Sequence, residues 1–171
     1  MKSLLITFVL SFILISLEAQ DNKKAGTGFP SNEFGLNLGS TTGLGLSYRH
    51  WFDDFGIQLT GIPYKDQNEF FSSLAFTVMY SFVETKHVRV FAYLGNHYMH
   101  HKTTVDTSWL GGGSSTSNET DITDKWNIGF GPGFSFGTTV NFTVQAGYGF
   151  YDITGAQKIL PAGEIGLYFR F

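Results

Sequence analysis

The sequence predicts an all-β protein: an eight-stranded antiparallel up-and-down transmembrane β-barrel with an N-terminal signal peptide. Three observations predict this fold. Beyond residue 32 the chain repeats segments in which apolar and polar residues alternate, and a period of two is typical of strands with one apolar face. Aromatic residues make up 17 % of the chain and charged residues only 15 %, whereas soluble domains have about 25 % charged residues. The connections between segments also alternate between short and longer.

The first twenty residues predict a secretory signal peptide. Lys2 supplies a positive charge, residues 4–15 are almost wholly apolar, and Ala19 is a small residue suited to cleavage. The apolar run is too short for a membrane-spanning helix, which needs about 20 residues. The chain has no Cys, so we expect no disulfide framework. The expected organisation is a signal peptide over 1–19, a short polar lead over 20–32 and a barrel domain over 33–171.

Four alternating segments fill the first half of the barrel domain. The first places Phe34, Leu36 and Leu38 on one face, with Gly and polar residues on the other. The second alternates in the same way but has His50 on its apolar face near its end. The third is short, and the fourth is regular over ten residues or more. The predicted strands are 33–39, 43–52, 55–63 and 72–83.

Four further segments fill the second half. The fifth is the least regular, because Phe91 and Tyr93 fall on the face opposite Val90 and Leu94. The sixth, seventh and eighth place large apolar residues on one face and mainly Gly, Ser, Thr, Asn and Gln on the other. Eight strands of similar length favour a meander closed into a barrel. The predicted strands are 88–100, 126–137, 140–153 and 162–171.

Alternation alone fits two kinds of barrel. A soluble ligand-binding barrel keeps its apolar face inside, whereas a membrane barrel turns that face to lipid and keeps a polar lumen. The minority face here is rich in Gly, Ser, Thr, Asn and Gln, whereas a solvated exterior would carry Lys and Glu. Aromatic residues gather towards the ends of the apolar face, as in girdles at a membrane–water interface. They are Phe52, Phe55, Phe82, Phe136 and Phe171 at one end, and Tyr98, Trp126 and Phe150 at the other.

The lengths of the connections also favour the membrane barrel. Membrane barrels join their strands by short turns on the periplasmic side and by longer loops outside. The second connection of the outward set is longer than any inward turn, and the third is the longest of all. Only the first outward connection is as short as a turn. The outward connections are 40–42, 64–71, 101–125 and 154–161, and the inward ones are 53–54, 84–87 and 138–139.

The end of the chain resembles the C-terminal signal by which bacterial outer-membrane barrels are recognised for insertion, through Glu164, Gly166, Phe169 and the terminal Phe171. Over residues 33–171 the chain resembles the small eight-stranded outer-membrane proteins of the OmpX and OmpA-barrel kind, and most of all the OmpX-like barrel domains of Bacteroidetes-type bacteria. The resemblance implies a place in the outer membrane of a Gram-negative cell, membrane lipid and the barrel-assembly machinery as partners, and a monomer. It implies no catalytic residues and no cofactor.

Charged residues on the minority face predict a network inside the barrel. Glu33, Arg49, Arg89 and Arg170 all fall on this face near the periplasmic end. An eight-stranded barrel is just wide enough for its interior side chains to fill it, so a wide pore is excluded. Buried ions need partners, and barrel closure brings the first strand between the second and the last. We therefore expect Glu33 to pair with Arg49 or Arg170.

A second carboxylate, Glu164, falls on the same face about 20 Å from Arg170 at ~3.3 Å per residue. We expect it to hydrogen-bond to Gln58 or Gln145. An alternative interpretation of the charged interior is a narrow path for ions or small solutes.

Three residues suggest a metal site. His97, Met99 and His101 share one face of a strand, and such ligands suit zinc or copper. No Cys and no cluster of carboxylates accompanies them, so we expect ordinary polar residues at the start of a loop and no metal. If a metal were bound here, His97 and His101 would be the candidate ligands.

An enzymatic alternative is a barrel that modifies lipid A. The deacylase type carries a His-x-Ser pair, but neither His97 nor His101 is followed two residues later by Ser. The acyl-transferring type needs His, Asp and Ser in its outer loops, and these types occur here as His100, Asp106 and Ser108 without a motif. We expect no catalysis.

The sequence therefore predicts a structural or surface-interaction role, with loop 101–125 facing a partner. Within it, a Gly/Ser run over 111–117 is typical of a flexible linker. Trp109 and Leu110 precede this run, and we expect them to pack over the barrel mouth or to contact a partner. The net charge of −3 and the lack of a basic run exclude nucleic acid as a partner.

Overall fold

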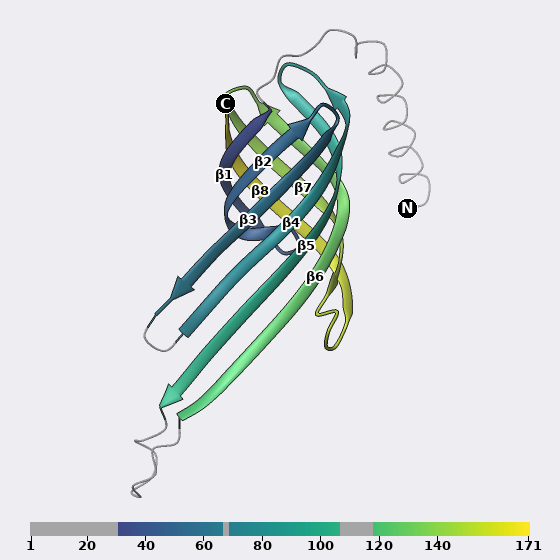
Figure 1. Ribbon diagram of the computed structural model, residues 1–171. Helices are drawn as coiled ribbons and strands as arrows, with labels where there is room; N and C mark the ends of the chain where they lie inside the picture. The colour runs from purple at the N-terminus through teal and green to yellow at the C-terminus, as the bar shows by residue number, and fades with distance from the viewer. Residues whose placement is uncertain (1–30, 67–68, 107–117) are drawn as a thin grey trace, which may run out of the picture.

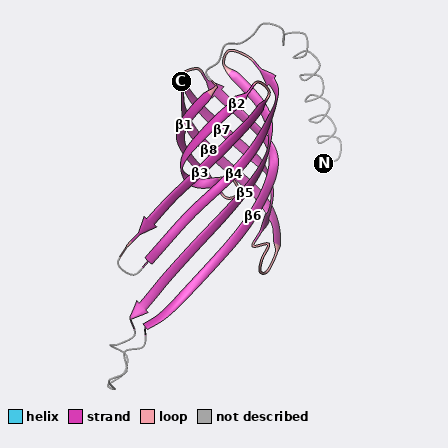
Figure 2. Cartoon of the chain, in the orientation of Figure 1, coloured by secondary structure: helices cyan, strands magenta, loops and turns pink. Residues whose placement is uncertain are grey.

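The computed structural model describes residues 31–66, 69–106 and 118–171 as one closed barrel (Figures 1 and 2). Eight antiparallel strands follow one another around the ring in sequence order, and β1 closes on β8. Within these ranges no helix is long and apolar enough to cross a membrane. The strands are β1 (Asn32–Gly39), β2 (Gly43–Phe52), β3 (Phe55–Lys65), β4 (Glu69–Glu84), β5 (Val88–Asp106), β6 (Asn118–Gly137), β7 (Val140–Tyr151) and β8 (Lys158–Arg170).

The predicted fold is confirmed in the number, order and direction of its strands. The connections at 40–42, 53–54 and 138–139 have the predicted bounds. The short connections 53–54, 85–87 and 138–139 lie at one end of the barrel, which we call the turn end. The opposite end, where β3 to β6 run on beyond the ring, is called the extension end.

The predicted strand ends at the extension end were wrong. Residues 101–106 of β5 pair with residues 118–123 of β6, although the sequence predicted a loop over 101–125. The β3–β4 hairpin likewise pairs as far as Lys65 and Phe70, beyond the predicted ends of both strands. These residues lie beyond the lumen, where neither face must be apolar, so the alternation fades while the backbone pairing continues. Figure 1 shows the four strands running well past the rest of the barrel.

The barrel is polar inside and apolar outside. Along β1, Glu33 is 0 % exposed and Asn37 is 2 % exposed, whereas Phe34 is 48 % and Leu36 is 57 % exposed. The neighbouring strands show the same pattern, because the register pairs inward-facing residues with inward-facing ones and outward-facing residues with outward-facing ones. A small apolar cluster of Trp51, Met79, Phe91 and Tyr93 also lies inside. The exterior is therefore a surface suited to lipid, and the interior is lined mainly by buried polar side chains.

Several sequence-based expectations fall outside the described residues. They are the signal peptide over 1–19, most of the polar lead, and the loop residues Ser108, Trp109 and Leu110 with the Gly/Ser run that follows them. The side chain of Asp106 is also outside the part of the chain that the structure describes.

Candidate functional site

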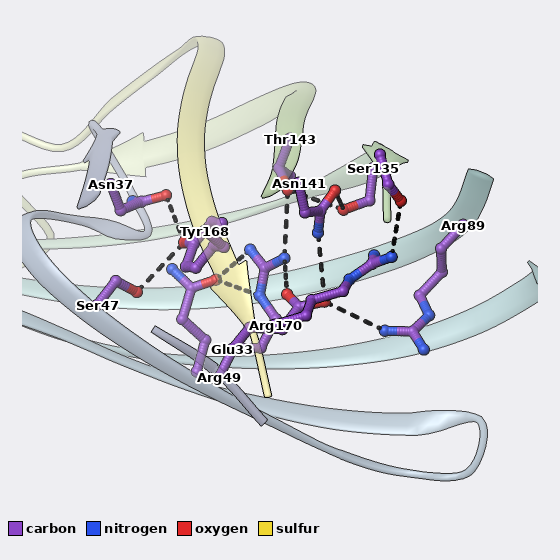
Figure 3. Close-up of polar contacts among 12 residues, drawn as sticks. Glu33, Asn37, Ser47, Arg49, Arg89, Ser135, Asn141, Thr143, Tyr168 and Arg170 are labelled. Atoms are coloured by element: carbon purple, nitrogen blue, oxygen red, sulfur yellow. Dashed lines mark hydrogen bonds and ion pairs between the residues drawn. The ribbon is translucent and has the colours of Figure 1, made fainter. Parts of the chain in front are cut away.

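The turn end of the lumen holds a charged cluster centred on Glu33 (Figure 3). Glu33 lies on β1 directly opposite Arg49 of β2 and Arg170 of β8, so barrel closure brings the three together. Its carboxylate lies 3.1 Å from Arg49 Nη1 and 2.7 Å from Arg170 Nε, and Arg89 Nη1 approaches to 3.7 Å. The structure thus brings together all four residues that the sequence predicted for the network.

Further contacts hold the three guanidinium groups. Arg49 donates to Gln58 Oε1 at 2.8 Å and stacks on the ring of Tyr168, 4.0 Å from its centroid. Arg89 pairs with Glu84 at 2.6 Å and lies 4.0 Å from the Trp51 ring. Two carboxylates therefore face three guanidinium groups, and aromatic rings take up part of the remaining positive charge. The sequence did not predict that Glu84 and these two rings would belong to the cluster.

The β1–β2 turn, residues 40–42, lies inside the barrel towards the extension end, and we call it the plug turn. Thr41 and Thr42 are 0 % exposed and lie inside the ring. The Asn37 amide donates to Thr42 Oγ1 at 2.9 Å and to the Gly43 carbonyl at 2.8 Å. Gly43 has a φ of 87°, a conformation that glycine adopts at little cost. This short first loop is therefore folded into the barrel.

Glu164 of β8 binds the plug turn. Its carboxylate accepts hydrogen bonds from the Thr41 amide at 3.0 Å, from Thr41 Oγ1 at 2.6 Å and from the Thr42 amide at 3.2 Å, and it also accepts one from Thr42 Oγ1. The prediction that Glu164 hydrogen-bonds to Gln58 or Gln145 was therefore wrong. Gln58 binds Arg49 instead. A turn that offers two amides and two hydroxyls satisfies a buried carboxylate better than one amide side chain.

Inward-facing glycines make room for the plug turn. A Cβ atom on Gly95 would lie 2.6 Å from the Thr41 carbonyl oxygen, and one on Gly149 would lie 2.9 Å from the Thr41 methyl group. A Cβ atom on Gly129 would overlap the Thr41 side chain itself. Three strands thus omit a side chain where Thr41 enters, and this recess is called the glycine socket. Short side chains at inward positions of β5, β6 and β7 were its signal in the sequence.

His97, one of the two metal candidates, contacts the plug turn. It is buried, its Nδ1 lies 2.9 Å from the Ser40 carbonyl and its Nε2 lies 2.8 Å from Ser73 Oγ. A carbonyl only accepts, so Nδ1 carries the hydrogen. Both ring nitrogens are therefore engaged. His101 lies on the same face four residues on, about 13 Å away at ~3.3 Å per residue. The described residues hold no group of three or more His, Cys, Asp or Glu side chains that could bind a metal ion.

The outward face of the extension carries Ser72, His100 and Asp124 side by side on β4, β5 and β6. His100 Nδ1 donates to Asp124 at 2.6 Å, as in a catalytic dyad. No hydrogen bond joins Ser72 to His100 among these described residues, and the backbone amides around them belong to the sheet ladder. The row lacks a nucleophile–base contact and an oxyanion hole, so it is not an assembled triad.

The residues of the C-terminal pattern lie on both faces of β8. Glu164 is buried against the plug turn, whereas Phe169 and Phe171 are exposed on the exterior at the turn end. Gly166 lies opposite Asn37, and a Cβ there would meet the Tyr168 ring. Glu164 therefore has a structural contact of its own in the folded barrel.

Comparison with solved structures finds small membrane barrels, while no family model and no curated protein matches the chain. The N-terminal β-barrel domain of Pseudomonas aeruginosa OprF is 20 % identical, with a TM-score of 0.45 over 82 % of this chain and 95 % of that one. Neisserial surface protein A is 16 % identical, with a TM-score of 0.41 over 82 % and 94 %. Ail, the attachment invasion locus protein of Yersinia pestis, is also 16 % identical, with a TM-score of 0.41 over 82 % and 93 %.

Proposed function

We propose that this chain is an integral protein of a bacterial outer membrane, a monomer with a structural or surface-interaction role. The observation that carries the proposal is the inverted polarity: charged residues are buried in the lumen, and large apolar side chains cover the outside. A water-soluble barrel would expose that apolar surface at a large cost in free energy. In the proposed orientation the turn end faces the periplasm and the extension faces the outside.

The closed lumen favours this role over that of a conduit. The Glu33 cluster fills one end and the plug turn fills the other, so a solute would have to displace both. The enzymatic alternative, a barrel that modifies lipid A, has support only from the His100–Asp124 pair. Among the described residues no serine is hydrogen-bonded to His100. The extension supplies what a surface-interaction role needs, because four paired strands hold a broad surface away from the membrane.

The test is a fractionation of cells that express the full chain. We expect the protein in the outer-membrane fraction, with a folded form that migrates faster than the boiled form on a gel and an N-terminus that begins after residue 19 or 20. Recovery of the protein as a soluble periplasmic species would overturn the proposal. Equal masses of lipid A from cells with and without the protein would support this role, whereas a difference in mass would support the enzymatic alternative.

A further inference from the structure

The inner face of the extension is an exposed apolar surface that neither lipid nor core explains. Strand alternation makes this face continuous with the lumen wall, so it is turned away from the lipid-facing exterior. In spite of this, Tyr64 is 53 % and Ile62 is 37 % exposed on it. An apolar surface of this kind on a part of the chain that faces water is typical of a binding site.

The register gathers the apolar residues into one place. Tyr64, Phe71 and His101 lie opposite one another on β3, β4 and β5. One row nearer the barrel, Met99 lies opposite Lys125 of β6. The Phe71 and His101 rings meet edge to face, with centroids 6.4 Å apart. Next to Tyr64, a groove of about 310 Å³ is lined by Phe71, Met99, His101, Thr123 and Lys125.

The charges around the groove differ between its two ends. Lys125 lies at its barrel end, and among the described residues no ion pair involves Lys125. Two carboxylates of this face, Glu69 and Asp121, flank Thr103 beyond the opposite end of the groove. Asp121 is four positions from Lys125 along β6, about 13 Å at ~3.3 Å per residue. The barrel end therefore favours an anion, and the outer end repels one.

We propose that this groove binds a small amphiphilic carboxylate, a molecule with a compact apolar body and one anionic group. The apolar body lies between Phe71 and Met99, and the carboxylate pairs with Lys125, with Thr123 and His101 as hydrogen-bonding neighbours. The volume is at the lower end of the range of small-molecule sites, about 300–1,000 Å³, which suits a body of about ten carbon atoms. This inference deepens the surface-interaction role and rests on it only for the physiological source of the ligand.

The test uses the two methionines of the described chain as reporters. Met99 lines the groove, and Met79 is buried in the lumen. The folded barrel, labelled at its methionine methyl groups, is placed in nanodiscs of zwitterionic lipid and titrated with 4-phenylbutyrate and with the neutral 4-phenylbutanol. We expect a saturable shift of the Met99 methyl resonance, an unchanged Met79 resonance, and tighter binding of the carboxylate than of the alcohol.

Two lysine variants separate the groove from general charge effects. Lys125→Gln should weaken carboxylate binding by up to about fivefold, the upper end for a solvent-exposed charge pair, and should leave alcohol binding unchanged. Lys102→Gln is the matched control, because Lys102 is exposed on the same extension and lies one position from His101 on the opposite face. Its affinity should equal that of the parent chain. Equal weakening in both variants, an unshifted Met99 resonance, or shifts of Met79 and Met99 together would overturn the proposal. None of these readouts depends on where the protein resides in the cell.

Discussion

Two buried glutamates lie towards the two ends of the lumen and are satisfied by different means. Glu33 is surrounded by three guanidinium groups from β2, β5 and β8. Within the described part of the chain, the donors to Glu164 are all neutral, namely two amides and two hydroxyls of the plug turn. The first carboxylate is held by opposite charge and the second by the geometry of a turn. A charge cluster needs only the right residues in register, whereas the plug also needs space for a piece of backbone.

The largest expected effect is at the charged end. Glu33→Ala removes the carboxylate that Arg49 and Arg170 contact directly and leaves buried guanidinium groups without it. Breaking a buried ion pair in this way costs about 3–5 kcal/mol. The urea midpoint of the folded barrel, read from the heat-modifiable band, should fall accordingly. Glu69→Ala is the control, because Glu69 is an exposed carboxylate of the extension. Equal midpoints for the two variants would show that the cluster does not stabilise the barrel.

The difference between the two glutamates also explains what the sequence predicts and what it does not. Opposite charges at inward positions of adjacent strands identify the Glu33 network, because alternation and closure fix their register. The partners of Glu164 are not adjacent in that register. They come from a loop that has to fold back into the barrel, and alternation says nothing about the path of a loop. The strand ends were missed for a related reason, since the residues of the extension pair without a strict alternation of apolar and polar side chains.

The second effect concerns Glu164, which accepts the hydrogen bonds of the plug turn. Glu164→Gln keeps the size of the side chain but replaces one acceptor oxygen with a donor, which would face the amide and hydroxyl of Thr42. Leaving buried donors without an acceptor costs about 1–3 kcal/mol for each group, so we expect a loss of about 3 kcal/mol in the same urea titration. Gln145→Glu is not a suitable control because it adds a charge. Glu69→Gln, on an exposed carboxylate, should leave the midpoint unchanged. A Glu164→Gln barrel as stable as the parent would mean that the plug turn needs no acceptor.

The third effect tests the space rather than the charge. Gly129→Val places branched carbon atoms where Thr41 lies in the glycine socket. Overpacking of a filled interior costs about 2 kcal/mol. Gly163→Val is the matched control on β8, because a Cβ at Gly163 meets nothing within 4 Å. A Gly129→Val midpoint equal to that of Gly163→Val would mean that the plug turn does not depend on the socket.

The same variant separates the two closures of the lumen. Displacement of the plug turn alone leaves the Glu33 cluster across the turn end, so Gly129→Val should show no added conductance in a planar bilayer. The double variant Gly129→Val with Glu33→Ala opens both ends and should conduct if it folds. Conductance by Gly129→Val alone would show that the charged cluster does not seal the turn end.

The smallest effect is expected at a carboxylate outside the lumen, Asp124 of the extension. Hydrogen bonds from His100 and then from Tyr98 hold the pKa of Asp124 below its ordinary value. A carboxyl group with a lowered folded-state pKa stabilises the folded form above its unfolded pKa of about 4, and the contribution is lost as the pH falls through the folded-state value. Amide resonances of residues 102–104 should therefore weaken as the pH falls below about 4, before those of the barrel strands change. Asp124→Asn removes this acid-induced step, and a step that persists in Asp124→Asn would assign it to another carboxylate. Because the pair is exposed to water, its loss leaves the urea midpoint of the barrel unchanged, which sets it apart from both buried glutamates.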